Sequence, residues 1–279
     1  MILKELIRHA LQEDIGSGDH SSLAAIPETA KGKMKLLAKE NGIIAGIEVA
    51  KEVLQQVDPS ISMKYFFKDG DEICVGDIVF ELEGYARGML TAERTLLNFM
   101  QRLSGIATVS KQYADAVKGT KTKILDTRKT TPNLRVLEKY AVKIGGSENH
   151  RFGLYDMIML KDNHIDFSGG IENAIDATHN YLKKNKLDLK IEIETRTIEE
   201  VKRVIKHGKI DRIMLDNFTP EAINEAMLWI DGKYETEASG GITLKNIKEY
   251  VQTGVDYISI GALTHHILSL DLSLKFIAL

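Results

Sequence analysis

Residues 191–217 read IEIETRTIEEVKRVIKHGKIDRIMLDN, and this stretch decides the fold. It begins with a β-rich run at 191–194, continues with a helical pattern and returns to a β-rich run at 212–215. Two strands joined by a helix run parallel, because the helix carries the chain back to the same end of the sheet. The stretch therefore predicts a parallel βαβ unit.

The same alternation repeats on both sides of this stretch. Further β-rich runs lie at 123–126, 157–160, 236–238 and 257–260. Helical patterns separate most of them. Six such runs over about 140 residues predict an α/β barrel, or nearly one.

The chain before the barrel has a different pattern. A helix is expected to end near Gly16, and strand-like stretches at 33–38 and 78–82 accompany a helix near 47–57, which indicates a small sheet with a helix packed on it. A helical segment at 91–118 contains Gly105, where we expect a break and a domain boundary. Residues 269–279 alternate apolar and polar side chains, which predicts a strand that returns to the first domain.

Composition sets the class of protein. With 279 residues, 43% of them hydrophobic and 28% charged, the chain has the profile of a globular protein. A net charge of -3 gives no general attraction to nucleic acid or to an anionic membrane. The single Cys74 excludes an intramolecular disulfide and fits a cytoplasmic location, and we expect neither a signal peptide nor a membrane span.

Positive charge gathers in one part of the chain. Residues 121–161 contain nine Lys or Arg (121, 123, 128, 129, 135, 139, 143, 151 and 161) against four Asp or Glu (126, 138, 148 and 156). Arg128, Lys129 and Lys161 follow predicted strands, and Arg151 comes just before one. Because guanidinium groups bind carboxylates and phosphates through two hydrogen bonds, this cluster predicts a ligand with several anionic groups.

Other polar residues also follow the predicted strands, whose interiors we expect to be apolar. Ser239-Gly240-Gly241 and Gly261-Ala262 end the last two strands, the usual phosphate position of such barrels. Glu194 and Asp216 are either counter-charges to the basic cluster or ligands for sugar hydroxyls and Mg²⁺. His150 is expected to orient the substrate rather than to act as an acid or base.

These residues lie within motifs that resemble the quinolinate phosphoribosyltransferases, also called nicotinate-nucleotide pyrophosphorylases. The matching motifs occur in the same order at 13–20, 92–95, 103–108, 126–132, 149–151, 161–164, 215–217, 239–241 and 261–265. They cover nearly the whole chain. Two loop departures, Asn133 after the proline and Ser147-Glu148 before Asn149, remove no charged group.

The resemblance implies an N-terminal α/β sandwich at 1–108, an incomplete TIM-like α/β barrel at 109–266 and a tail at 267–279 that rejoins the first domain. It implies a homodimer, or a higher oligomer, in which Arg94 completes the active site of the partner subunit. The implied reaction transfers the phosphoribosyl group of phosphoribosyl pyrophosphate to quinolinate with decarboxylation. Nicotinate mononucleotide, pyrophosphate and CO₂ are the implied products, in de novo NAD biosynthesis.

The resemblance also implies roles for individual residues. Quinolinate would be bound by Arg94, Arg128, His150 and Arg151. Lys129 and Lys161 would serve its carboxylates or the pyrophosphate, and both are implied catalytic residues. Glu194 and Asp216, also implied as catalytic, would face the ribose and bind Mg²⁺. Ser239, Gly240 and Gly261 would bind a phosphate.

Three alternatives stay open from the sequence. One is a barrel lyase that forms a Schiff base through Lys161. A second is the related molybdenum-locus homologue, whose pattern differs by lacking the lysine at the position of Lys161. The third is a metabolite sensor without catalytic activity.

Overall fold

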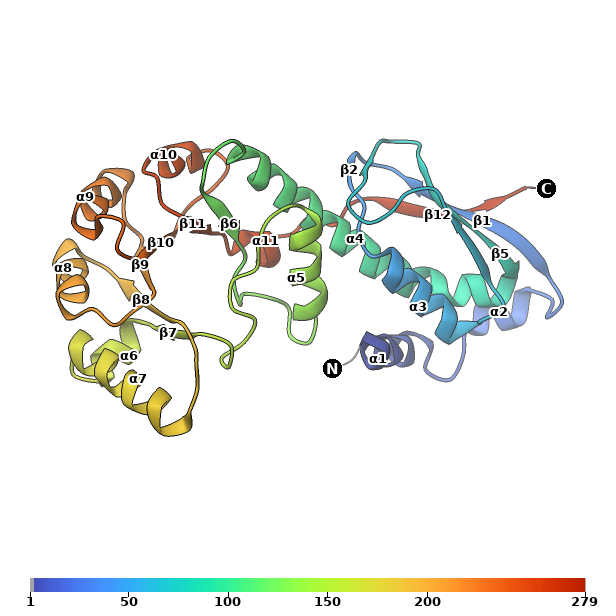
Figure 1. The fold of residues 1–279 in the computed structure, drawn as a ribbon. Helices are drawn as coiled ribbons and strands as arrows, with labels where there is room; N and C mark the ends of the chain where they lie inside the picture. Colours follow the sequence, from blue (N-terminus) through green and yellow to red (C-terminus); the bar gives the residue numbers. More distant parts are fainter. Residues whose placement is uncertain (1–2, 279) are drawn as a thin grey trace. The chain divides into compact units, whose positions relative to one another are not determined.

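The structure, a computed structural model, describes residues 3–278. The chain forms two compact units, which interleave along the sequence (Figure 1). The first comprises Met1–Lys111, Thr130–Gly146 and Leu263–Leu279, and the second comprises Gln112–Lys129 and Ser147–Ala262. The contiguous domain bounds expected from the sequence stay a prediction. Within residues 3–278, no helix is both long enough and apolar enough to span a membrane.

An antiparallel sheet forms the frame of the first unit, with the strand order β12-β1-β5-β3. These strands are β1 (Lys31–Ala38), β3 (Ser62–Tyr65), β5 (Ile78–Tyr85) and β12 (Leu272–Ile277). A second, two-stranded sheet pairs β2 (Gly42–Ile43) with β4 (Glu72–Ile73). The predicted strand near the carboxyl terminus is β12, which lies antiparallel to β1.

The first unit also contains helices. They are α1 (Leu3–Ile15), α2 (His20–Ala25), α3 (Ile47–Val57), α5 (Arg135–Ile144) and most of α4 (Ala86–Ala116) and α11 (Ala262–His265). The apolar side of α3 is buried, as its spacing predicts, and Gly16 after α1 has a positive φ of 53°.

The expected helix break at Gly105 is wrong. Helix α4 continues through this residue without interruption. A Cβ atom at Gly105 would lie 2.2 Å from the backbone oxygen of Leu268. The glycine therefore permits a close approach of two chain segments, and its weak helix propensity is overridden by packing.

We expect Gly105→Ala to lower the free energy of unfolding by roughly 2 kcal/mol, because the added methyl group overlaps a backbone atom that cannot turn away. Thermal or urea denaturation measures the change. Asn98→Ala, at an exposed position of the same helix, is the matched control and should cost little. Equal stabilities of the two variants would contradict the packing explanation.

A parallel sheet of six strands forms the second unit, in the order β6-β11-β10-β9-β8-β7. Its strands are β6 (Lys123–Leu125), β7 (Ile158–Leu160), β8 (Ile191–Thr195), β9 (Arg212–Asp216), β10 (Glu235–Ser239) and β11 (Tyr257–Ser259). All six lie where the sequence predicts strands. Among the described residues β6 and β7 do not pair, so the barrel is open, and the predicted α/β class with an incomplete barrel is confirmed.

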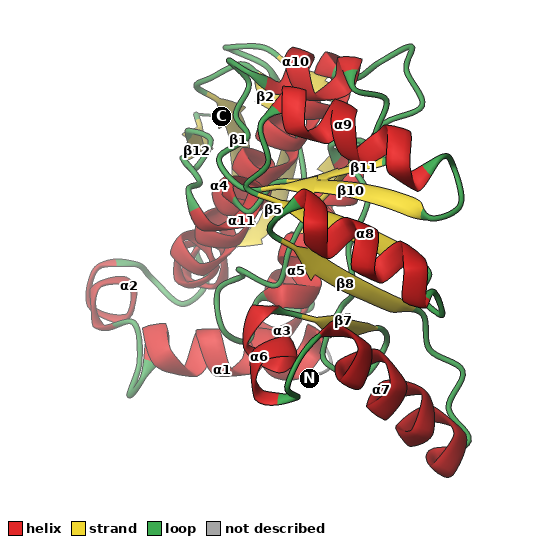
Figure 2. Cartoon of the chain, turned by 90° about the vertical axis from the view of Figure 1, so that its left-hand side faces the viewer, coloured by secondary structure: helices red, strands yellow, loops and turns green. Residues whose placement is uncertain are grey.

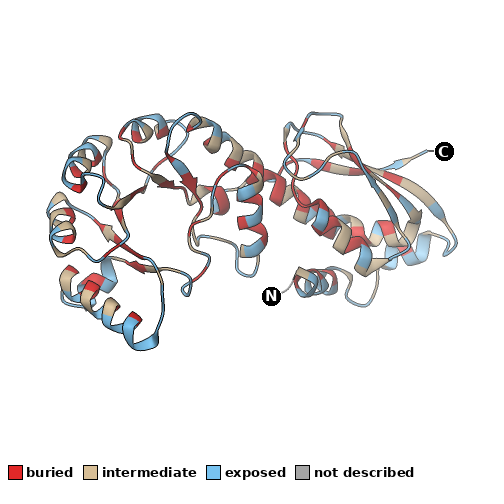
Figure 3. Ribbon diagram, viewed as in Figure 1, coloured by how far each residue is buried: buried red, intermediate tan, exposed pale blue. Residues whose placement is uncertain are grey.

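Helices cover the outer face of this sheet (Figures 1 and 2). They are α6 (Asp162–Phe167), α7 (Ile171–Asn185), α8 (Ile198–His207), α9 (Pro220–Ile230) and α10 (Ile247–Gln252). Figure 3 shows that their buried residues face the strands, as in α8, where Val201 and Val204 are buried. Thr197 and Thr219 cap α8 and α9 through side-chain oxygens that accept backbone N–H groups. Each cap fixes the residue at which the helix begins after the carboxyl end of the preceding strand.

Candidate active site at the carboxyl ends of the parallel strands

The inner face of the parallel sheet is charged. Alternate residues of a strand project from one face, so Glu192 and Glu194 share the face of β8 opposite Ile191 and Ile193. The register places Arg212 between Glu192 and Glu235, and Ser239 beside Asp216. The expectation that the strand interiors are apolar is therefore wrong for β8, β9 and β10. Apolar residues such as Ile191 and Ile193 lie on the outer face, which the helices cover.

Most of the predicted site residues lie together at the carboxyl ends of these strands, which we call the carboxyl edge. They are Arg128 and Lys129 after β6, His150 and Arg151 in the loop before β7, Lys161 after β7, Glu194 in β8, Asp216 in β9, Ser239 and Gly240 at the end of β10, and Gly261 after β11. A parallel sheet brings these ends to one side. The second unit thus contains every predicted site residue except Arg94.

Two arginines at this edge repel each other. Arg151 is half-buried and donates from Nη1 to the backbone oxygen of Met157 at 3.1 Å. Burial lowers the pKa of Arg151, and the nearby positive charge of Arg128 lowers it further. Two guanidinium groups held near each other in this way favour an anionic ligand that would relieve the repulsion.

A lysine and a carboxylate form an ion pair at the neighbouring strands. Lys161 Nζ lies 2.5 Å from Glu194 Oε1, and the Glu194 side chain is only 11% exposed. This ion pair agrees with the counter-charge interpretation of Glu194. A phosphorylated ligand that attracted Lys161 would release the carboxylate for other partners.

Asp216 lies on the next strand, β9. Asn217 Nδ2 donates to Asp216 Oδ2 at 2.8 Å, and the Asn217 backbone N–H donates to the oxygen of Ser239 at 2.8 Å. A Cβ atom at Gly240 would lie 2.1 Å from Asn217 Oδ1, and Gly240 has a φ of 97°. Only glycine fits there. The loops after β9 and β10 therefore form one packed edge.

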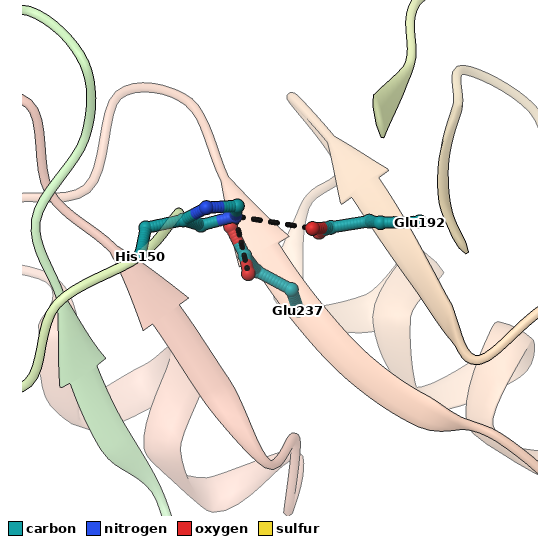
Figure 4. Close-up of side chains that lie close together, drawn as sticks. All are labelled: His150, Glu192 and Glu237. Carbon is teal, nitrogen blue, oxygen red and sulfur yellow. Dashed lines mark ion pairs between the residues drawn. The ribbon is translucent and has the colours of Figure 1, made fainter. Parts of the chain in front are cut away.

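A buried charged cluster consists of His150, which lies at the carboxyl edge, and of Glu192, Glu237 and Arg212, which lie within strands β8, β10 and β9. His150 Nε2 lies 3.1 Å from Glu192 Oε2 and 3.4 Å from Glu237 Oε2 (Figure 4). Arg212 Nη1 donates to Glu237 Oε2 at 2.9 Å. Both glutamate side chains are 0% exposed. Within this cluster Arg212 supplies the permanent positive charge that faces the two buried carboxylates.

The cluster also shifts its own pKa values. Burial raises the pKa of Glu192 to about 7, and the charge of Glu237 adds to the effect. Burial lowers the pKa of His150, but hydrogen bonds to Glu192 and Glu237 outweigh it and raise the pKa to about 9. Although Glu237 is buried, its contacts with His150, Ser259 and Arg212 lower its pKa. The imidazole and the carboxylates therefore compete for protons.

Glu192, Glu237 and Arg212 were missed as site residues from the sequence. The signal was available: Ile-Glu-Ile-Glu at 191–194 and Glu-Thr-Glu at 235–237 place charges at every second residue of a buried strand.

Asp126, which is also buried, anchors the loop before β7. Its Oδ1 accepts the His150 backbone N–H at 2.9 Å, and its Oδ2 accepts Asn149 Nδ2 at 2.6 Å.

Arg94 is the exception among the predicted site residues. It lies exposed on α4, in the first unit. Its assignment to the active site of a partner subunit therefore stays a prediction.

The fold and the carboxyl edge together define a class, namely an α/β-barrel enzyme that binds a substrate with several anionic groups. Family models agree with this class. The model described as Quinolinate phosphoribosyl transferase, N-terminal domain, matches residues 19–104, and its C-terminal counterpart matches residues 106–275. The chain belongs to the quinolinate phosphoribosyltransferase family, which confirms the predicted resemblance.

Individual relatives match over nearly the full length. A protein of Bacillus subtilis named probable nicotinate-nucleotide pyrophosphorylase [carboxylating] is 43% identical, over 98% of this chain and 92% of its own. Quinolinate phosphoribosyltransferase [decarboxylating] 2b, mitochondrial, of Nicotiana tabacum is 46% identical, over 98% of this chain and 82% of its own. The crystal structure of NadC from Streptococcus pyogenes superposes with a TM-score of 0.93 at 40% identity, covering 99% of this chain and 97% of that one.

Proposed function

We propose that this chain transfers the phosphoribosyl group of phosphoribosyl pyrophosphate to quinolinate with decarboxylation. The products are nicotinate mononucleotide, pyrophosphate and CO₂, and the reaction is a step of de novo NAD biosynthesis. One observation supports this most strongly: Arg128 and Arg151 lie at the carboxyl edge of a chain of this family, close enough for the charge of Arg128 to lower the pKa of Arg151. Two neighbouring carboxylates on a planar ring are the ligand that such a pair favours.

The quinolinate site consists of Arg128 and Arg151, with Arg94 from a partner subunit. The two arginines bind the carboxylates through charge-assisted hydrogen bonds and orient the ring nitrogen toward the phosphoribosyl donor. Their mutual repulsion in the free chain makes the doubly anionic ligand preferable to a singly charged one.

Phosphoribosyl pyrophosphate binds at the part of the carboxyl edge formed by the ends of β8 to β11. Ser239, Gly240 and Gly261 supply backbone and hydroxyl groups for a phosphate, since small residues here let the backbone approach closely. Lys129 and Lys161 bind the pyrophosphate or a carboxylate of quinolinate. Glu194 and Asp216 face the ribose from adjacent strands.

The same two carboxylates fit Mg²⁺, which prefers oxygen ligands and keeps part of its water shell beside substrate phosphates. Both side chains are partly exposed at the ends of β8 and β9. When bound, Mg²⁺ neutralises charge on the pyrophosphate leaving group. Lys161 pairs with Glu194. When the pyrophosphate group attracts Lys161 away from Glu194, the lysine also neutralises charge on the leaving group.

The chemistry follows from this arrangement. The ring nitrogen attacks the anomeric carbon as the bond to pyrophosphate breaks, and positive charge develops on the ribose. Glu194 and Asp216 stabilise that charge electrostatically. The ring nitrogen becomes quaternary, so its positive charge stabilises the carbanion left on the adjacent ring carbon when the carboxylate there leaves as CO₂, and that carbon then takes up a proton.

An assay with purified protein, quinolinate, phosphoribosyl pyrophosphate and Mg²⁺ tests the proposal. We expect nicotinate mononucleotide and CO₂ to form together. A folded protein that yields neither product would refute the assignment. Borohydride trapping through Lys161 would instead favour the Schiff-base lyase.

We propose that the active protein is a homodimer in which Arg94 enters the partner's site. Arg94→Ala and Lys161→Ala should each be inactive alone, yet a mixture should regain part of the activity, because one hybrid site carries both native residues. Activity after subunit exchange measures this. No recovery, despite exchange shown by differently tagged subunits, would contradict a shared site.

We also propose a cytoplasmic location. A single, exposed Cys74 supports it, because a free thiol is stable in a reducing compartment. The tobacco relative carries the word mitochondrial in its name, so fractionation of the native cell is the deciding measurement.

A further inference from the structure

The buried charged cluster lies below the residues that the proposed reaction uses. Glu192 projects from β8 and Glu237 from β10, and the ring of His150 enters between them (Figure 4). All three side chains are at most 5% exposed. A substrate at the carboxyl edge does not need any of these carboxylates, so the burial of two negative charges requires another explanation.

A metal ion is one candidate, because one nitrogen and two carboxylate oxygens lie within 4.8 Å of one another. Arg212 argues against it. Its Nη1 already lies 2.9 Å from Glu237 Oε2 and 4.0 Å from Glu192 Oε2, which places a permanent positive charge where the cation would act. The cluster is therefore held by contacts of its two carboxylates with Arg212 and His150 rather than by a cation.

The other ring nitrogen of His150, Nδ1, contacts the backbone of Arg151. The backbone N–H of Arg151 donates to His150 Nδ1 at 2.7 Å. An acceptor nitrogen must have a free lone pair, so Nδ1 carries no proton and the ring proton is on Nε2. The two carboxylates favour a second proton on the ring, because they raise the pKa of His150. That proton would sit on Nδ1 and point at the Arg151 N–H group, whose nitrogen is 2.7 Å away, so the contact with the backbone opposes it.

Three hydrogen bonds thus fix the backbone around Arg151. His150 Nδ1 holds the Arg151 amide, and Asp126 holds the His150 amide at 2.9 Å and the Asn149 side chain at 2.6 Å. The Arg151 guanidinium in turn donates to the oxygen of Met157. The ring of His150 connects the buried carboxylates to the amide of Arg151.

We propose that Glu192 and Glu237 are positioning residues that hold His150 as the Nε2–H tautomer, so that its Nδ1 anchors the amide of Arg151 and aims that guanidinium at quinolinate. This rests on the proposed function for the role of Arg151. His150 then acts through Arg151 and makes no direct contact with quinolinate. The sequence-based expectation that His150 lines the pocket is the competing account.

Two isosteric variants separate these accounts. Asparagine places its oxygen where Nδ1 lies and can still accept the Arg151 amide, whereas glutamine reaches the position of Nε2 but offers no acceptor to that amide. We expect His150→Gln to raise KM for quinolinate about tenfold, the loss of one hydrogen bond, and His150→Asn to raise it less. KM for phosphoribosyl pyrophosphate should change little in either variant.

The opposite order would overturn the proposal, because a direct contact from Nε2 is kept by glutamine and lost with asparagine. Equal increases would overturn it as well. Thermal denaturation of both variants shows whether each is folded. If the asparagine variant does not fold, the NMR measurement below decides.

Nitrogen-15 NMR of the native protein labelled at histidine reads the tautomer directly, with the His150 signals assigned by their loss in a His150 variant. We expect a protonated Nε2 and an unprotonated Nδ1 at neutral pH. A proton on Nδ1, with or without one on Nε2, would overturn the proposal. This readout needs no activity, so a protein that shows the expected tautomer but does not use quinolinate would refute the proposed function alone.

The carboxylates are tested by a matched pair at position 192. Glu192→Gln keeps an oxygen that accepts the Nε2 proton and should preserve both the tautomer and KM for quinolinate. Glu192→Leu removes the acceptor and should raise KM for quinolinate at least about fivefold, since a buried N–H is left without its partner. Unchanged KM and tautomer in the leucine variant would overturn the positioning role of Glu192.

Discussion

Arg151→Met is expected to lower kcat/KM for quinolinate at least about 30-fold. Removal of one partner from a desolvated charge pair costs ~2–5 kcal/mol, and each ~1.4 kcal/mol is a factor of ten. The variant should nevertheless be as stable as the native protein or more stable, because burial and the charge of Arg128 both disfavour the native guanidinium. Steady-state kinetics and thermal denaturation, measured together, test both statements.

Arg203→Met is the matched control for this experiment. Arg203 lies on α8, is half exposed and pairs with Glu172 at 2.6 Å, away from the carboxyl edge. Its loss should change kcat/KM less than about twofold, since exposed ion pairs contribute at most ~1 kcal/mol. Similar losses in both variants would mean that the effect at Arg151 is not specific to the site.

Arg212→Met is expected to lower the free energy of unfolding by about 3–5 kcal/mol. Arg212 is 11% exposed, and without it Glu192 and Glu237 would keep their buried charges uncompensated. The variant also loses the contact of the guanidinium with the Tyr257 ring, 3.9 Å from its centroid. Urea denaturation at neutral pH measures the change, and Arg203→Met again provides the exposed control.

The pH dependence of this loss has a defined sign. The pKa of Glu192 is about 7 in the folded protein against 4.5 for an ordinary glutamate. A raised pKa means that this group favours the folded state below its unfolded pKa and loses that contribution as the pH rises through about 7. The cost of Arg212→Met should therefore be smaller below about pH 5 than above about pH 8. A cost independent of pH would contradict the uncompensated-charge explanation.

Much of the fold could be predicted from local patterns. The strand at 191–195 and the helix at 198–207 follow from hydrophobic periodicity, and the parallel order of the sheet follows from the strand–helix alternation. Gly105 shows the limit of such patterns. Its role depends on Leu268, which is distant in sequence, and no local signal distinguishes a glycine that breaks a helix from one that admits a neighbouring backbone.

The candidate site divides in the same way. Residues such as Lys161 and Asp216 were predictable because a parallel sheet gathers its carboxyl ends, so position along the chain indicates position in the fold. The partner of His150 was not, since its contact with Glu192 depends on side-chain conformation and strand register. For Lys161 the sequence indicated two candidate counter-charges but not that Glu194 is the one in contact. Arg94 is a third case, because its proposed role belongs to an assembly and not to one chain.

Quinolinate labelled with carbon-13 at its 2-carboxylate tests the central claim most directly. The account predicts that labelled CO₂ forms only when phosphoribosyl pyrophosphate is present, with one nicotinate mononucleotide and one pyrophosphate for each CO₂. Release of CO₂ without phosphoribosyl pyrophosphate, or nucleotide that retains the label, would contradict it.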